Sequence, residues 1–204
     1  MYKRHSDDNF GDVGRFHTKF GLPNVNDEGP GPTEVDPDLL RFRLKFLLEE
    51  LTELMQAVGA QFVPEYDPID RDIVGMGIML DADAGVDHGK AFDALLDLVY
   101  VAHGTAHILG YPWQDGWDLV QKANMSKVRA QADGSDSKRG SSFDVVKPPG
   151  WTPPDIEGLL RRYGYPTIKC PRCGSPDPKL HPAVQFEGEV QTCPNSFHNQ
   201  ETLP

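Results

Sequence analysis

Glu49-Glu50-Leu51-Thr52-Glu53 lies inside a strongly apolar helical pattern. The pattern begins at Asp36-Pro37, an N-cap carboxylate followed by a proline suited to the first helical position, and is expected to run to about Ala60. Its apolar positions form a wide stripe: Leu40, Leu44, Leu47, Leu48, Leu51, Leu54, Met55 and Val58. Such a stripe packs against other helices, so this stretch predicts a helical fold.

A second long helix is expected from about His88 to Leu109, where Gly110 ends it. This helix is apolar nearly all round, which is typical of a helix at the centre of a bundle or buried in a dimer. A third helix is expected from Pro112 to about Ala130, and short helices over residues 10–20 and 155–163. Residues 64–87 give no clear prediction, and residues 131–142 are polar and are expected to form a loop.

The acidic residues of the two long helices form closely spaced pairs. Glu49 and Glu53 are four residues apart, Glu50 and Glu53 three, and Asp93 and Asp97 four. Side chains at these spacings share a helix face, where like charges repel. A bound divalent cation would turn that repulsion into attraction, and carboxylate oxygens suit Mg²⁺ or Mn²⁺. Solvated helix faces and structural ion pairs are the alternative interpretations.

Composition narrows the function classes. The 204 residues carry a formal net charge of −11, unlike proteins that bind a nucleic-acid backbone through a basic face. An acidic site can still bind nucleotides if metal ions supply positive charge. No apolar run reaches the roughly 20 residues of a membrane span, and the first residues lack the apolar core of a signal peptide. A cytoplasmic protein is therefore expected.

The last 35 or so residues differ in character, because they hold all three cysteines. Cys170, Cys173, Cys193 and His198 supply four ligands at a spacing suited to structural zinc, with His181 as a competing ligand. The alternative is a reduced tail with incidental cysteines. We expect two parts: a helical domain over residues 1–155 and a C-terminal extension over residues 156–204.

Several segments together carry a family resemblance. They are Glu49-Glu50-Leu-Thr-Glu53-Leu, Phe92-Asp93-Ala-Leu-Leu-Asp97-Leu-Val-Tyr100-Val, Gly104-Thr-Ala106 and Ala123-Asn124-Met-Ser-Lys127-Val. Over about residues 10–155 the chain resembles the all-α nucleoside triphosphate pyrophosphohydrolases, in particular MazG-like and phosphoribosyl-ATP-pyrophosphohydrolase-like proteins, including bacteriophage members. The resemblance implies an all-α helical bundle, usually a dimer or a dimer of dimers. It also implies metal-dependent cleavage between the α and β phosphates of a nucleotide, releasing pyrophosphate.

The resemblance assigns roles to particular residues. The family's Glu-x-x-Glu motif falls on Glu50 and Glu53, with Glu49 or Glu50 able to accept a proton from the attacking water. The second motif, Glu-x-x-Asp, is not reproduced: aligning its Asp on Asp97 puts Ala94 at the Glu position, and aligning it on Asp93 puts Lys90 there. Asp93 and Asp97 together are expected to replace it, which leaves the number of metal ions open.

Asn124 and Lys127 match the family's Asn-Met-Ser-Lys segment, which implies contacts with phosphate oxygens. Without the resemblance, Lys127 would be an ordinary lysine complementing the dipole at a helix C-terminus. Lys147, before Pro148-Pro149, is a further candidate for a phosphate contact on a closing arm. His103 and His107 could form a metal pair, but are expected to pack or to form hydrogen bonds.

The sequence therefore predicts a (deoxy)nucleoside triphosphate pyrophosphohydrolase using Mg²⁺ or Mn²⁺, with structural Zn²⁺ in the tail, acting in nucleotide-pool sanitation or adjustment, in a cell or for a virus. No P-loop pattern is present, which argues against a Walker-type NTPase. The alternative is an inactive helical bundle that binds a protein or nucleic-acid partner through the tail. Base and sugar preference cannot be read from the sequence.

Overall fold

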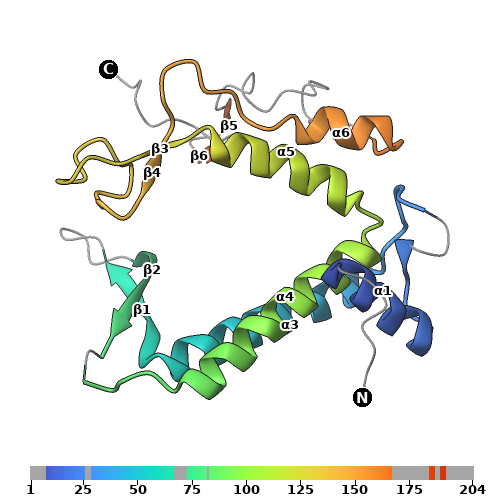
Figure 1. Cartoon of the computed structure of the whole chain (residues 1–204), viewed down its shortest axis with the longest axis horizontal. Helices are drawn as coiled ribbons and strands as arrows, with labels where there is room; N and C mark the ends of the chain where they lie inside the picture. The colour runs from blue at the N-terminus through green and yellow to red at the C-terminus, as the bar shows by residue number, and fades with distance from the viewer. Residues whose placement is uncertain are drawn as a thin grey trace.

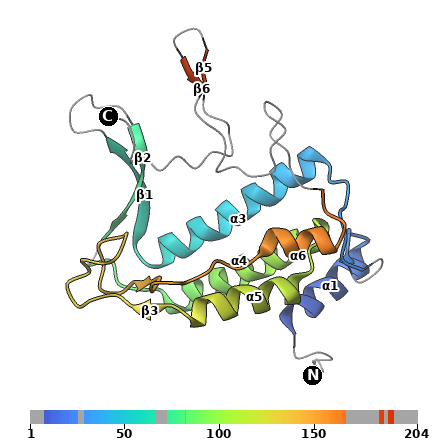
Figure 2. The ribbon, with the colours of Figure 1, turned by 90° about the horizontal axis from the view of Figure 1, so that it is seen from above.

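The computed structural model describes residues 8–25, 29–66, 73–81, 83–166, 184–186 and 189–191. This part of the chain is mostly helical and forms two arms (Figure 1). Helices α3 (Pro37–Ala57) and α4 (His88–Ile108) run side by side in one arm, as two perpendicular views show (Figures 1 and 2). Helices α5 (Trp113–Met125) and α6 (Ile156–Arg162) lie together in the other arm. The predicted helical architecture is thus confirmed in outline.

Helix α1 (Asn9–Phe20) packs on the C-terminal half of α4 and matches the helix predicted over residues 10–20. The Asp8 carboxylate accepts a hydrogen bond from the Phe10 amide at its start. At its end Gly21 adopts φ 66°, a left-handed conformation that favours glycine and returns the chain toward α4. Ordinary capping chemistry therefore sets both ends of this helix.

Helices α3 and α4 also begin as their sequences predict. Asp36 caps α3 through the Asp38 amide, with Pro37 at the first helical position, and Asp87 caps α4 through the Lys90 amide. The prediction that α3 continues to about Ala60 is wrong by three residues. Gly59, with φ 70°, turns the chain out of the helix in a space closed by Ala84.

A β-hairpin, which the sequence did not predict, joins α3 to α4. Strand β1 (Ala60–Tyr66) pairs antiparallel with β2 (Ile73–Leu80), placing Phe62 opposite Ile78. The hairpin extends from the end of the α3–α4 arm opposite α1 (Figure 1). Its apolar side chains are largely exposed: Phe62, Tyr66, Ile73, Met76, Ile78, Met79 and Leu80.

The prediction that the third helix runs from Pro112 to about Ala130 is wrong at its C-terminal end. Pro112 is the N-cap residue, but α5 stops at Met125, and the chain enters strand β3 (Val128–Arg129). This strand pairs with β4 (Val145–Val146) across the loop predicted over residues 131–142. The loop is held by Asp144, which accepts hydrogen bonds from Ser137 and Arg139.

Helix α6 follows the prediction for residues 155–163. Asp155 caps it through the Gly158 amide, and Leu159, only 2% exposed, lies against Gly116 of α5. A final hairpin pairs β5 (Val184–Phe186) with β6 (Glu189–Gln191). None of the described helices is long and apolar enough to span a membrane.

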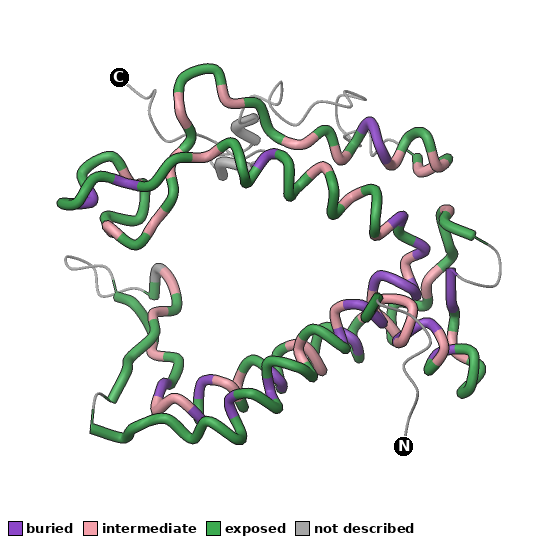
Figure 3. Tube along the Cα trace, viewed as in Figure 1, coloured by how far each residue is buried: buried purple, intermediate pink, exposed green. Residues whose placement is uncertain are grey.

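Buried residues lie along the contact between α3 and α4 and between α1 and α4, whereas much of the surface of α4 is exposed (Figure 3). The sequence predicted that α4 is central to a bundle or buried in a dimer; in a single chain it packs against α1 and α3 and leaves its other face exposed. The exposed apolar residues on α3 and α4 are Phe42, Leu44, Leu48, Leu51, Phe92, Leu95, Leu96, Val99 and Tyr100. Within the described part of one chain, this apolar surface is left uncovered.

Candidate active site

The acidic residues predicted to form one site lie on the paired helices α3 and α4. Glu49, Glu50 and Glu53 come from α3, and Asp93 and Asp97 from α4. Glu50 is only 6% exposed, whereas the other four side chains are exposed. One carboxylate therefore lies within the helix pair, and the remaining four surround it at the surface.

The five carboxylates interact electrostatically. Burial raises the pKa of the Glu50 carboxyl above its usual value, and four nearby negative side chains raise it further. In decreasing order of effect these are Asp97, Glu53, Glu49 and Asp93. The structure thus brings together, around Glu50, every carboxylate that the sequence placed in the site.

The chemistry of these donors fits a hard divalent cation, because all are carboxylate oxygens and their mutual repulsion raises the Glu50 pKa. Their positions do not form a finished metal cage. In the described ranges, no three His, Cys, Asp or Glu side chains converge closely enough to hold an ion. Exposed carboxylates such as Glu53 and Asp97 would have to turn toward a bound cation.

The two positions at which the second family motif would place a glutamate are occupied by Ala94 and Lys90 of α4. Ala94, at the position of the expected Glu when Asp97 is taken as the motif's Asp, is 3% exposed. A glutamate there would replace a closely packed methyl group. In the other register, Lys90 is exposed and pairs with Asp87 at the start of α4. Neither position offers a ready substitute for the missing carboxylate.

The predicted phosphate contacts lie on the other arm. Asn124 is exposed in the last turn of α5, Lys127 follows this helix, and Lys147 follows β4. The pairing of Val128 with Val146 brings the two lysines to the same end of the β3–β4 ladder. Both ammonium groups lie over the Trp151 ring, with Nζ-to-centroid distances of 5.9 Å for Lys127 and 4.4 Å for Lys147.

The acidic and basic groups of the site therefore come from separate helix pairs. Helix α3 packs along α4, and α5 packs with α6, so the two groups occupy different arms (Figure 1). The sequence analysis assigned both groups to one site because the family motifs that contain them follow one another along the chain. Nothing in those motifs indicates the angle between the two arms.

The histidine pair of α4 does not belong to the carboxylate group. His103 and His107 are buried beside α1, and His107 Nε2–H donates a hydrogen bond to the Phe10 carbonyl oxygen at 2.9 Å. The expectation that they pack or form hydrogen bonds is confirmed. Sequence reasoning missed Arg43, which is 8% exposed and donates to the Val101 carbonyl oxygen at 2.6 Å, tying α3 to α4.

The remaining predicted ligands lie outside the described residues. These are Cys170, Cys173, Cys193 and His198, together with the competing His181. The predicted zinc site therefore stays a prediction, as does the division of the chain at residue 155.

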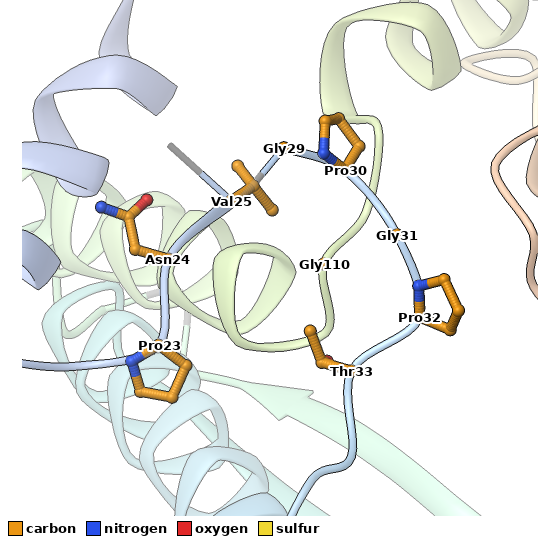
Figure 4. Close-up of a pocket in the computed structure, with 9 residues that line it drawn as sticks. All are labelled: Pro23, Asn24, Val25, Gly29, Pro30, Gly31, Pro32, Thr33 and Gly110. Carbon is orange, nitrogen blue, oxygen red and sulfur yellow. The ribbon is translucent and has the colours of Figure 1, made fainter. Parts of the chain in front are cut away.

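Among further cavities of the described chain, one of about 520 Å³ beside the start of β1 has Asp81 as its single acidic lining residue. Another of about 310 Å³ lies where the loop of residues 29–33 meets Gly110, lined by glycine backbone and by Pro, Asn, Val and Thr side chains (Figure 4). None of these side chains titrates, so the cavity lacks an acid or base. A third, apolar groove of about 450 Å³ runs between α5 and α6, past Trp117 and Leu159.

Comparison with known proteins identifies a family. The family model described as phosphoribosyl-ATP pyrophosphohydrolase matches residues 13–124, more than half of the chain. This family is part of the all-α MazG-like NTP pyrophosphohydrolase superfamily. The match begins within α1, covers α3 and α4 and ends one residue before the end of α5, and it includes all five carboxylates and Asn124. A search among curated proteins finds no match.

Proposed function

The chain belongs to the phosphoribosyl-ATP pyrophosphohydrolase family, a family of hydrolases, and we propose that it cleaves nucleoside or deoxynucleoside triphosphates to a monophosphate and pyrophosphate. The observation that carries this proposal is the burial of Glu50 among four other carboxylates on α3 and α4. A buried carboxylate among other negative charges lowers the stability of the folded protein unless positive charge lies nearby, and a divalent cation would supply that charge. A role in adjusting a cytoplasmic nucleotide pool, cellular or viral, would follow.

The reaction is a displacement at phosphorus. A water oxygen forms a bond to the α-phosphorus, the bond from that phosphorus to the bridging oxygen breaks, and pyrophosphate leaves. Glu50 is suited to accept the water's proton, because its raised pKa makes it a stronger base than an exposed carboxylate. Glu49, beside it in the chain, is the second candidate for this role.

Metal ions enter through the carboxylates. Glu50, Glu53, Asp93 and Asp97 are the residues that would hold Mg²⁺ or Mn²⁺. A bound cation would acidify the attacking water and neutralise phosphate charge. On the other arm, Asn124, Lys127 and Lys147 would contact phosphate oxygens through an amide and two ammonium groups.

The active form in this proposal is a homodimer or a dimer of dimers. A single chain leaves large apolar side chains of α4 exposed, among them Phe92 at 65% and Leu96 at 53%. Exposed apolar patches of this kind mark interaction surfaces. A second copy covering this surface would also bring further side chains toward the carboxylates.

Product analysis tests the proposed reaction. The full chain is incubated with Mg²⁺ or Mn²⁺ and each common ribo- and deoxyribonucleoside triphosphate, and phosphoribosyl-ATP, in water enriched in heavy oxygen. We expect pyrophosphate and a monophosphate that carries the heavy oxygen, because water attacks the α-phosphorus. Glu53→Gln should lose turnover, whereas Glu157→Gln, an exposed carboxylate on α6, should not. Absence of turnover with every substrate and both metals would refute the proposal.

The tail is proposed to hold structural zinc through Cys170, Cys173, Cys193 and His198. Elemental analysis of the reduced full chain should find about one zinc per chain, and replacing Cys170 and Cys173 with serine should remove it. Reduced protein without zinc would contradict this part of the proposal.

A further inference from the structure

Trp151 joins three segments beside the C-terminal end of α5. Its indole Nε1–H donates to the Ala123 carbonyl oxygen at 2.9 Å, and Ala123 is itself buried in the last turns of α5. The same oxygen accepts from the Ser126 hydroxyl at 2.7 Å. The indole is therefore fixed to the helix end by a directional bond, and its ring has a defined orientation.

The segment before Trp151 explains how the ring reaches this position. The Trp151 amide donates to the Pro148 carbonyl oxygen at 3.0 Å, closing a four-residue turn. Pro149 and Gly150 occupy the centre of this turn, and Gly150 has φ 79°. Proline followed by a glycine at positive φ is the pattern of a type II turn. This turn folds the chain back after Lys147 and directs the indole toward the end of α5.

Two lysines lie close to this ring. Lys127 lies just before β3 and Lys147 just after β4, and the antiparallel pairing of Val128 with Val146 makes them opposite neighbours. Their ammonium groups lie 5.9 Å and 4.4 Å from the centroid of the Trp151 ring. Among the described residues, no carboxylate lies within ion-pair distance of either lysine.

Two cations held next to each other by strand pairing and by one aromatic ring, with no described carboxylate within ion-pair distance, form a receptor for an anion with two charged ends. Cation–π attraction to an indole offsets part of the repulsion between the ammonium groups and reduces the side-chain entropy lost when an anion binds. The negative charge that neutralises the two lysines must therefore come from a bound anion. A diphosphate, with oxygens on two phosphorus atoms, can contact both ammonium groups at once.

We propose that Trp151 is a positioning residue that holds Lys127 and Lys147 as a two-point clamp for a diphosphate group. This inference rests on the proposed function, in which the bound group is the β,γ-diphosphate of the substrate and then the pyrophosphate product. The indole itself does not contact the reacting atoms. It acts by holding the lysines together and by anchoring the segment after β4 to α5.

Inorganic pyrophosphate is the probe for a test by calorimetric titration into the full chain, without divalent cation. Loss of the indole in Trp151→Leu should weaken binding about 5- to 30-fold, since each exposed cation–π contact contributes roughly 0.5–1 kcal/mol. Trp151→Phe should recover part of the loss, because it keeps an aromatic face without the N–H donor. Trp117→Leu, an exposed tryptophan of α5, is the matched control and should bind as the original chain does.

A second measurement separates positioning from a general effect on folding. In a chain with Lys127→Met and Lys147→Met, Trp151→Leu should cause no further loss of pyrophosphate binding, because no ammonium groups remain to be held. An equal loss in both backgrounds would overturn the proposal. So would unchanged binding in Trp151→Leu, or no binding of pyrophosphate by the original chain.

The same variants distinguish the clamp from the proposed reaction. Pyrophosphate binding that depends on Trp151, in a chain that turns over no nucleotide, would contradict the proposed function and retain the clamp. Turnover with the same KM in Trp151→Leu would retain the function and contradict the clamp. With both ideas correct, the KM for the triphosphate should rise by a larger factor than kcat falls.

Discussion

The Phe10 ring lies flat against the His107 imidazole, with 3.8 Å between the ring centroids and 9° between the ring planes. Trp113 stacks on the other side of the cluster, with its ring centroid 5.6 Å from that of Phe10. His107 is fully buried, and its Nδ1 atom has no hydrogen-bond partner within the described residues. Helix α1 is thus attached to α4 through an imidazole that is suited to remain neutral.

This arrangement predicts acid sensitivity. Burial lowers the pKa of His17, His103 and His107, although Asp8 raises those of His103 and His107. Above about pH 6.5 the histidines are neutral in both states, and the stability they contribute is complete. As pH falls below that value, the unfolded chain binds protons that the folded chain does not, so the free energy of unfolding decreases.

Urea unfolding at a series of pH values measures the effect. The slope should approach about 1.4 kcal/mol per pH unit for each proton taken up on unfolding. His107→Gln should reduce that slope, whereas His88→Gln, at an exposed position, should leave it unchanged. A free energy of unfolding that is constant between pH 7.5 and 5.5 would contradict the prediction.

Phe10 offers a direct test of the stacking contact. Phe10→Leu keeps an apolar side chain but removes the aromatic faces between His107 and Trp113. The free energy of unfolding should fall by about 0.5–1.5 kcal/mol beyond the effect of lost area. Phe143→Leu is the control, because Phe143 is 92% exposed and should change stability little.

The raised pKa of Glu50 predicts a link between stability and metal. The pKa of Glu50 is higher in the folded state than in the unfolded state. The free energy of unfolding therefore decreases as pH rises from the unfolded-state pKa through the folded-state pKa. At neutral pH the metal-free protein should therefore gain stability from Glu50→Gln, which removes the buried charge. Mg²⁺ should raise the melting temperature of the original chain and have a smaller effect on Glu50→Gln. A larger Mg²⁺ effect in the variant would contradict the proposed ligand.

Gly110 should be intolerant of any side chain. Its φ is 70°, and an added Cβ would overlap the Gly31 carbonyl oxygen. Gly21 has a similar φ of 66° but open space around it, so it is a matched control. Gly21→Ala should cost about 1–2 kcal/mol from backbone strain alone, and Gly110→Ala clearly more. Equal losses in urea unfolding would show that the loop of residues 29–33 moves away easily.

Dimerisation is predicted from the uncovered face of α4. Leu96→Asp places a charge in that face and should shift the protein to monomers, since an unpaired charge is costly to bury. Light scattering coupled to size-exclusion chromatography, over a range of concentrations, measures the assembly. Phe143→Asp makes a similar change on a loop and should preserve it. An original chain that is monomeric at every concentration would refute the proposed dimer.

Local chemistry made much of the helical architecture predictable. Asp36-Pro37, Gly21 and Gly110 mark helix ends because capping and positive φ depend on a few adjacent residues. The β-hairpin was missed because its apolar run, Ile73–Leu80, contains two glycines and has no clear period. The end of α5 was missed because β3 exists only through its pairing with β4, sixteen or more residues away.

The sequence predicted which carboxylates lie together in the site better than it predicted their geometry. The grouping of Glu50 with Asp97 could be foreseen from spacing and family resemblance, and the structure places them in one electrostatic group. The burial of Glu50 alone could not, because it depends on how α3 and α4 rotate against each other. Arg43 gave no signal, since an arginine in a helix is usually exposed.

Tyr165 has a consequence for the order in which the chain acquires its shape. Its hydroxyl lies 2.8 Å from the carbonyl oxygens of both Gly31 and Leu109, and burial raises its pKa to about 12, so it remains a donor. During synthesis both carbonyls leave the ribosome long before the residue that joins them. The α3–α4 arm can therefore form early, but the two Tyr165 contacts at its end can form only after the whole of α6 has been made.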